Sequence, residues 1–291
     1  MELLRTMMFV PGNRVRMIEK AKELSPDALI FDLEDAVPPA EKATAGQMVR
    51  EALASGAFGH VRAFARVNAL STGLLPADLD AVVVPELYGI VLPKVEDPEG
   101  VAEASRLLDE REARLGLPPG RIRILPIIET VRGVLGLPRV AGCSPRFVGL
   151  SFGIEDFATD LGVQRSQDAI EALYPRISVA LHARATDMPA IDTVYANVED
   201  VEGLEKEALL ARQLGFRGKL VLHPRQIDVV NRVFTPSAEE IEYARRVVAA
   251  YDEAEARGEA SVALDGKMVD IPIAVRARAL IAMAEKIATA R

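Results

Sequence analysis

Eight short apolar runs recur between residues 6 and 224 and alternate with longer, helix-like stretches. Most of the runs are continuous rather than alternating, as in the strands of parallel sheets that are covered on both faces. Repeated strand–helix units connect with a right-handed crossover, and eight of them predict a closed (β/α)₈ barrel of the TIM type. The runs are Thr6–Gly12, Ala28–Asp35, Arg62–Asn68, Gly89–Glu96, Arg123–Thr130, Arg146–Gly153, Ala190–Asn197 and Gly218–Pro224. Helices are expected at Arg14–Leu24, Ala40–Ala54, Pro98–Leu115, Asp168–Arg184 and Val201–Leu214.

An open, doubly wound α/β sheet is the alternative to the barrel. No G-x-G-x-x-G follows the first run, which weakens the dinucleotide-binding version of that fold. The chain has 291 residues, of which 49% are hydrophobic, and (β/α)₈ barrels of this size form single domains. We therefore expect the barrel to occupy residues 1–235.

Residues 236–291 are expected to form a C-terminal helical extension or lid. Ser237 and Glu240 have the spacing of a capping box, which predicts a helix that continues to about Arg257. A polar loop is expected at Gly258–Asp270, with a turn at Asp265–Gly266. The final helix is expected at Ile271–Ala290, because Pro272 suits a first helical turn.

Composition limits the classes of function. The formal net charge of −8 gives no support for nucleic-acid binding. Cys143 is the only cysteine, so neither an internal disulfide nor a cysteine-based zinc cluster can form, and we expect Cys143 to be a small buried residue. No apolar run reaches the length of a membrane span and no signal-peptide pattern opens the chain, so a cytoplasmic protein is expected.

Polar side chains gather where the apolar runs end. In a barrel all of these ends lie on one face, which is the face that carries active sites. Any single such residue could be an ordinary loop residue, whereas the whole set favours a site. The set comprises Asp32, Glu34, Asp35, Arg66, Asn68, Lys94, Glu96, Glu129, Glu155, Asp156 and His223.

Two acids of this set stand out because each follows a buried run. Glu129 closes the fifth run and Asp156 follows the sixth. A buried carboxylate must be paired or bound to a metal, and two of them at one mouth of a sheet suit Mg²⁺ or Mn²⁺. The alternative is that each acid caps the helix that follows it.

Eight sequence blocks together resemble the citrate lyase beta-subunit family, which belongs to a wider group with malyl-CoA lyases and the HpcH/HpaI aldolases. Each block alone is weak, but all eight occur in order over nearly the whole chain. They are RTMMFVPGNR (Arg5–Arg14), IFDLEDAV (Ile30–Val37) with Lys42, RVN (Arg66–Asn68), LPKVE (Leu92–Glu96), PIIET (Pro126–Thr130), FGIEDFATDLG (Phe152–Gly162), KLVLHPRQI (Lys219–Ile227) and DGKMVD (Asp265–Asp270).

The resemblance implies a (β/α)₈ barrel assembled as a homotrimer, with one Mg²⁺ held by Glu129 and Asp156. It implies that Arg66 binds the carboxylate of a keto or hydroxy acid, for which a planar guanidinium has the right shape. Glu129 then serves both the substrate and the metal. Asp270 is implied as an acid that the C-terminal segment brings to a neighbouring subunit's site; its alternative role is to cap the last helix.

The same resemblance places coenzyme A, or an acyl-carrier equivalent, near Arg14, Asp35 and Lys42. The alternative for Arg14 and Lys42 is an ordinary solvated helix face. His223 is expected to be a structural histidine beside Pro224.

The activity implied is Mg²⁺-dependent cleavage of a carbon–carbon bond in a citryl or malyl thioester, which yields a keto acid and an acyl thioester. Citrate lyase alpha and acyl-carrier subunits are the implied partners. Two alternatives stay open: a stand-alone relative that runs condensation or thioester hydrolysis, and a non-catalytic subunit that has kept the fold.

Overall fold

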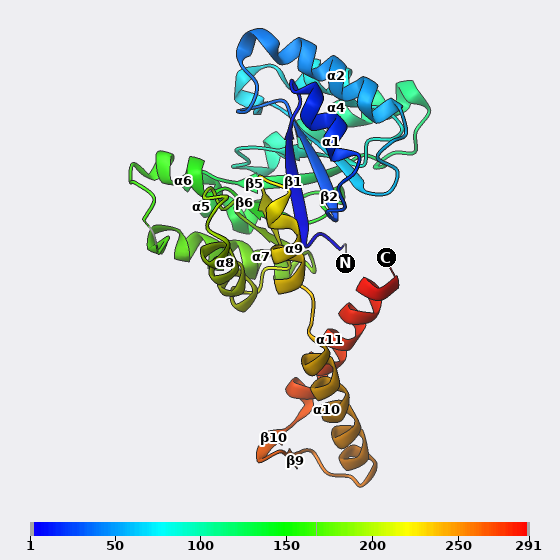
Figure 1. Cartoon of the computed structure of the whole chain (residues 1–291), viewed down its shortest axis with the longest axis vertical. Coiled ribbons are helices and arrows are strands. Elements are labelled where there is room, and N and C mark those ends of the chain that lie inside the picture. Colours follow the sequence, from blue (N-terminus) through cyan, green and yellow to red (C-terminus); the bar gives the residue numbers. More distant parts are fainter. Residues whose placement is uncertain (1–2, 167, 290–291) are drawn as a thin grey trace. The chain divides into compact units, whose positions relative to one another are not determined.

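The computed structural model describes residues 3–166 and 168–289, so that Ala290, the expected end of the last helix, lies outside the described residues. The chain divides into two compact units between Asn231 and Arg232 (Figure 1). None of the helices in these described ranges is long and apolar enough to cross a membrane.

The first unit is a closed barrel of eight parallel strands in sequential order, in which the last strand pairs with the first. This confirms the predicted (β/α)₈ barrel and excludes the open sheet. The strands are β1 (Thr6–Pro11), β2 (Ala28–Asp32), β3 (Arg62–Arg66), β4 (Gly89–Leu92), β5 (Arg123–Ile128), β6 (Leu150–Phe152), β7 (Ala190–Asp192) and β8 (Gly218–Val221).

Helices follow the strands around the barrel, as the strand–helix alternation predicted. They are α1 (Val15–Ala21), α2 (Lys42–Ala54), α3 (Leu75–Val82), α4 (Pro98–Leu115), α5 (Val131–Val140), α6 (Ile154–Leu161), α7 (Leu173–Ala185), α8 (Val201–Leu214) and α9 (Arg225–Val233). Short 3₁₀ turns precede α2, α3 and α7 at Pro39–Glu41, Leu70–Thr72 and Ile170–Ala172. The helix expected from Asp168 therefore becomes α-helical only at Leu173.

The interior of the barrel is an apolar core to which nearly every strand contributes. A buried cluster joins side chains from β1, β2, β3, β4, β5, β7 and β8 with Val148, which precedes β6. Because apolar side chains fill the barrel, ligands must bind at its ends, and the carboxyl ends of the strands carry the polar residues.

The predicted runs are longer than the strands because their last residues leave the sheet. Residues 33–35, 67–68, 93–96 and 129–130 all lie beyond the ends of their strands. The polar ends of the runs are therefore loop residues at the carboxyl face.

One expectation about the barrel is wrong. Cys143 is exposed in the loop after α5, not buried. Cysteine is buried only on average. Here Cys143 lies in the loop that follows α5, next to the exposed Gly142. Partial desolvation raises the pKa of the Cys143 thiol, which lowers its thiolate fraction and so argues against a nucleophilic role.

The second unit consists of α10 (Ala238–Ala256), a β-hairpin and α11 (Ile271–Thr289). The capping box is confirmed, since Ser237 and Glu240 each accept a hydrogen bond from the other's backbone N–H. The predicted turn at Asp265–Gly266 is confirmed, but the stretch Gly258–Asp270 that contains it forms a hairpin of β9 (Val262–Leu264) and β10 (Lys267–Val269) rather than a loop. Its two-residue turn has positive φ at Asp265 and Gly266, a conformation that favours hairpins.

Candidate active site

A cavity of about 430 Å³ opens at the carboxyl end of the barrel. Its lining includes Asp32, Arg66, Glu129 and Asp156, which follow or end β2, β3, β5 and β6. The structure therefore brings together three of the residues that the sequence predicts for the site, Arg66, Glu129 and Asp156. Phe9, Ile127, Val194, Leu220 and Leu222 supply apolar parts of the wall.

Glu129 lies at the bottom of this site and is 2% exposed. Its Oε1 accepts a hydrogen bond from the Lys94 backbone N–H at 2.8 Å. A side chain at Gly153 would place its Cβ 2.4 Å from Glu129 Oε2, so the glycine leaves room for the carboxylate. Thr130, and not Glu129, caps α5, because Thr130 Oγ1 accepts from Gly133 N at 2.9 Å. The capping alternative therefore does not account for Glu129.

Asp156 lies in the first turn of α6, with its side chain one-third exposed towards the cavity. The N-cap of α6 is Gly153, which has no side chain to cap the helix, and the first backbone N–H of α6, that of Ile154, donates to Thr193 Oγ1 at 2.9 Å rather than to Asp156. Burial, followed by the charges of Asp156 and Glu34, raises the pKa of Glu129 to about 8. The two carboxylates thus repel each other across a poorly hydrated gap. A cation bound between them would reduce this repulsion.

Arg66 is held rigidly rather than left free. Its Nε and Nη2 donate to the two oxygens of Asp32 at 2.7 and 2.6 Å, and its guanidinium lies 4.8 Å from the Phe9 ring centroid. Asp32 in turn accepts from the backbone N–H groups of Glu34 and Ala36. Its Nη1 lies 3.1 Å from Glu34 Oε2 and 3.6 Å from Asp35 Oδ2. A guanidinium has five N–H donors, so an anion in the cavity would share the donors not used by Asp32 with these two acids.

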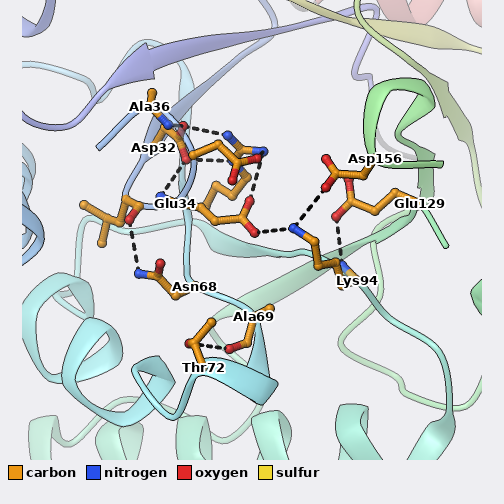
Figure 2. Close-up of polar contacts among 12 residues, drawn as sticks. Asp32, Glu34, Ala36, Asn68, Ala69, Thr72, Lys94, Glu129 and Asp156 are labelled. Atoms are coloured by element: carbon orange, nitrogen blue, oxygen red, sulfur yellow. Dashed lines mark hydrogen bonds and ion pairs between the residues drawn. The ribbon is translucent and has the colours of Figure 1, made fainter. Parts of the chain in front are cut away.

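Lys94 is a site residue to which the sequence patterns assign no role. Its Nζ donates to Glu34 Oε1 at 2.9 Å and lies 3.2 Å from Asp156 Oδ1 (Figure 2). Burial opposes its charge, but Glu34, Glu129 and Asp156 raise the pKa of Lys94 above its ordinary value and keep it cationic. The available signal was a lysine at the polar end of the fourth run, two residues after β4, but only the fold shows which acids it contacts.

The residues predicted for coenzyme A occupy different environments. Arg14 is exposed before α1, and Asp35 is exposed on the cavity lining, 3.6 Å from Arg66 Nη1. The Lys42 ammonium donates to Leu33 O, Glu34 O and Asn68 Oδ1, which uses all three of its donors within the barrel.

Two further residues singled out in the sequence accept hydrogen bonds from nearby backbone N–H groups. Asp270 Oδ1 accepts from Ile273 N at 3.3 Å and so caps α11 in the second unit. His223 Nδ1 accepts from Arg225 N at 3.2 Å and holds the turn into α9, as a structural histidine would.

The carboxylates of Glu129 and Asp156 fit a small, hard cation. Within residues 3–166 and 168–289, no group of three or more Asp, Glu, His or Cys side chains is arranged to hold a metal. Mg²⁺ commonly takes only one or two protein carboxylates and completes its shell with water and substrate oxygens. The pair of acids beside an arginine therefore suits a substrate that is anionic and can chelate the metal.

Enzymes with a (β/α)₈ barrel carry their active sites at the carboxyl face, where this site lies. Residues 5–224 match the profile of the HpcH/HpaI aldolase/citrate lyase family. The chain belongs to this aldolase and citrate lyase family and is an enzyme of the carbon–carbon lyase class.

Three relatives illustrate the similarity. The chain is 40% identical over 283 residues to citrate lyase subunit beta of Leuconostoc mesenteroides subsp. cremoris, covering 97% of this chain and 93% of that one. It is 37% identical over 287 residues to a (3S)-malyl-CoA thioesterase of Cereibacter sphaeroides, covering 99% and 96%. The solved structure of CitE from Mycobacterium tuberculosis in complex with magnesium, acetoacetate and coenzyme A matches with a TM-score of 0.78 and 29% identity, covering 97% and 98%.

The raised pKa of Glu129 predicts a specific dependence of stability on pH. Because its folded-state pKa of about 8 exceeds the ordinary value of 4.5, the folded protein binds the extra proton between these pH values. Raising the pH through this window therefore destabilises the metal-free wild type, on the order of 3 to 5 kcal/mol more than Glu129→Gln, which cannot titrate. Urea unfolding at pH 5 and pH 9 in EDTA measures the difference. An identical pH dependence of the two proteins would contradict the assignment.

Proposed function

We propose that this chain is a Mg²⁺-dependent lyase that cleaves a citryl or malyl thioester into a keto acid and an acyl thioester. The observation that carries the proposal is the convergence of Glu129, Asp156 and Arg66 on one cavity. Two carboxylates and a guanidinium are complementary to a metal-chelated hydroxy acid.

Glu129 and Asp156 would hold the metal, and the donor set fits it. When bound there, Mg²⁺ supplies a Lewis acid for the hydroxyl and carboxylate oxygens of the substrate. The magnesium, acetoacetate and coenzyme A of the similar CitE structure support this assignment.

Arg66 would fix the substrate carboxylate. Its bidentate pairing with Asp32 sets the plane of the guanidinium before the substrate arrives, so that little side-chain entropy is lost on binding. The adjacent Phe9 ring keeps that face of the guanidinium away from water. Arg66 thus fixes which end of the acid faces Glu129.

The bond changes follow from a 3-hydroxy thioester. A base removes the hydroxyl proton, the oxygen's electron pair forms the carbonyl of the keto acid, and the carbon–carbon bond breaks. Its electron pair passes to the thioester as an enolate, and an acid then delivers a proton to the enolate carbon. Asp270 is our proposed acid–base residue for this carbon, contributed by another subunit of a homotrimer.

The thioester would be carried by coenzyme A or by an acyl-carrier subunit. Arg14 and Asp35, both exposed in loops that follow β1 and β2, are the proposed contacts. Lys42 would act indirectly by holding the loop that carries Glu34 and Asp35, since its donors are already used. A citrate lyase alpha subunit is a further proposed partner, supported by the similarity to citrate lyase subunit beta.

Thioester hydrolysis is the second proposed activity. It is supported by the 37% identity to a (3S)-malyl-CoA thioesterase over 99% of this chain. The same site would serve, with water attacking the thioester carbonyl in place of carbon–carbon cleavage, so that the thiol leaves and the hydroxy acid is released.

Product analysis separates these activities. Purified protein supplied with citryl-CoA or (3S)-malyl-CoA is expected to release a keto acid and an acyl-CoA in the presence of Mg²⁺, and to be inactive in excess EDTA. Asp156→Asn, which removes one proposed metal ligand, is expected to match the chelated wild type. Hydroxy acid plus free coenzyme A as products would identify the thioesterase, and full lyase activity in EDTA would contradict the metal-dependent mechanism.

Replacement of Arg66 tests the carboxylate contact. Arg66→Lys is expected to lower kcat/KM by about 10²-fold or more, because an ammonium cannot form a bidentate contact with a carboxylate. Arg62→Lys, at the opposite end of the same strand, is the matched control and should keep near wild-type kinetics. An unchanged kcat/KM in Arg66→Lys would remove Arg66 from the substrate site.

A further inference from the structure

Lys94 contacts three acids at the proposed metal position. Its backbone N–H binds Glu129 Oε1 at 2.8 Å, while its ammonium lies between Glu34 at 2.9 Å and Asp156 at 3.2 Å (Figure 2). One residue thus contacts both proposed metal ligands, through its backbone and its side chain.

The backbone of Lys94 is strained. Its φ of 51° lies in the left-handed region, which side chains other than glycine, asparagine and aspartate rarely adopt. Such a conformation costs on the order of 1 kcal/mol and persists where surrounding contacts over-determine it. Here it lets the N–H face Glu129 while the side chain turns back across the acids. A glycine would adopt this φ more easily but could not supply the ammonium.

The charges around the cavity are strongly unbalanced. Asp32, Glu34, Asp35, Glu129 and Asp156 are acidic, whereas Arg66 and Lys94 are the basic side chains paired with them. Arg66 is paired with Asp32 and with Glu34 Oε2, on the side of the site formed by β2 and β3. Lys94 is therefore the cation that lies directly against Asp156, where a divalent ion would also sit.

We propose that Lys94 is a positioning residue that makes the metal and the keto acid bind together, because its ammonium weakens the binding of the bare metal and strengthens the binding of the anionic acid. This inference rests on the proposed function, in which Glu129 and Asp156 hold a divalent cation.

The reason is electrostatic. A positive charge a few ångströms from a divalent cation repels it, and the same charge attracts the carboxylate of a keto acid. With both ligands present, the charge of the acid offsets the repulsion between the metal and Lys94. The two ligands then favour each other, which is a positive and reciprocal coupling of their affinities. An enzyme with this coupling does not sequester the metal tightly in the absence of substrate.

Binding of Mn²⁺, measured from the electron paramagnetic resonance signal of the free ion at pH 8, tests the inference. Lys94→Met is expected to bind Mn²⁺ alone about tenfold more tightly than the wild type. It is also expected to bind pyruvate more weakly once loaded with Mn²⁺, so that pyruvate increases Mn²⁺ affinity less than in the wild type. Lys94→Gln repeats the loss of charge with a polar side chain, should the methionine variant not fold.

Two controls separate charge from structure. Lys94→Arg keeps the charge and should retain most of the coupling. Lys20→Met removes one positive charge from an exposed position on α1 and should leave both affinities unchanged. If Lys94 had a purely structural role, the neutral variants would bind both Mn²⁺ and pyruvate more weakly. The electrostatic role instead shifts the two affinities in opposite directions.

The outcomes are distinguishable from failure of the proposed function. If wild-type protein binds Mn²⁺ and the neutral Lys94 variants bind it equally or more weakly, the inference about Lys94 is overturned and the metal site stands. If wild-type protein binds no Mn²⁺ with or without pyruvate, both are overturned.

Discussion

The close approach of carboxylates at the carboxyl end of the barrel is the constraint on which the site depends. Glu129 is almost completely buried beside Asp156 and Glu34, and like charges in a poorly hydrated space cannot all be ionised without compensation. Arg66 and Lys94 provide part of that compensation within the protein. A divalent cation between Glu129 and Asp156 would provide the remainder.

Several local features follow from this requirement. Gly153 lacks a side chain because the Glu129 carboxylate occupies that space, and Lys94 adopts a left-handed conformation so that its N–H and its ammonium reach different acids. Asp32 orients Arg66 and the loop after β2 at once. Backbone strain, a glycine and a buried ion pair thus share one cause, which is the placement of negative charge around a cavity.

The barrel was predictable because its signals are local and repeated. Continuous apolar runs between helical stretches indicated parallel strands, and their polar ends indicated the functional face. The same reasoning selected Glu129 and Asp156, because each follows a buried strand. A carboxylate that is buried at such a position must be paired or bound to a metal. Arg66 belonged to the same set of polar ends, the family resemblance gave it the role of binding a carboxylate, and the structure brings all three residues to one cavity.

The features that were not predicted depend on tertiary contacts. Glycines in α5 weaken its helix signal, yet Gly133 and Gly136 are required because a Cβ there would lie 2.6 and 2.3 Å from the carbonyl oxygens of Val95 and Glu96. The hairpin in the second unit was hidden in a polar stretch, and the contacts of Lys94 depend on loops more than 30 residues away. Such information exists only once the strands have closed into a barrel.

Isothermal titration of the purified protein with pyruvate, glyoxylate and oxaloacetate, each with and without Mg²⁺, tests the central claim most directly. The account predicts that at least one keto acid binds when Mg²⁺ is present, and that this binding is lost in EDTA and in Glu129→Gln. Keto acid binding that is equally strong without the metal would contradict a site built from Glu129, Asp156 and a divalent cation.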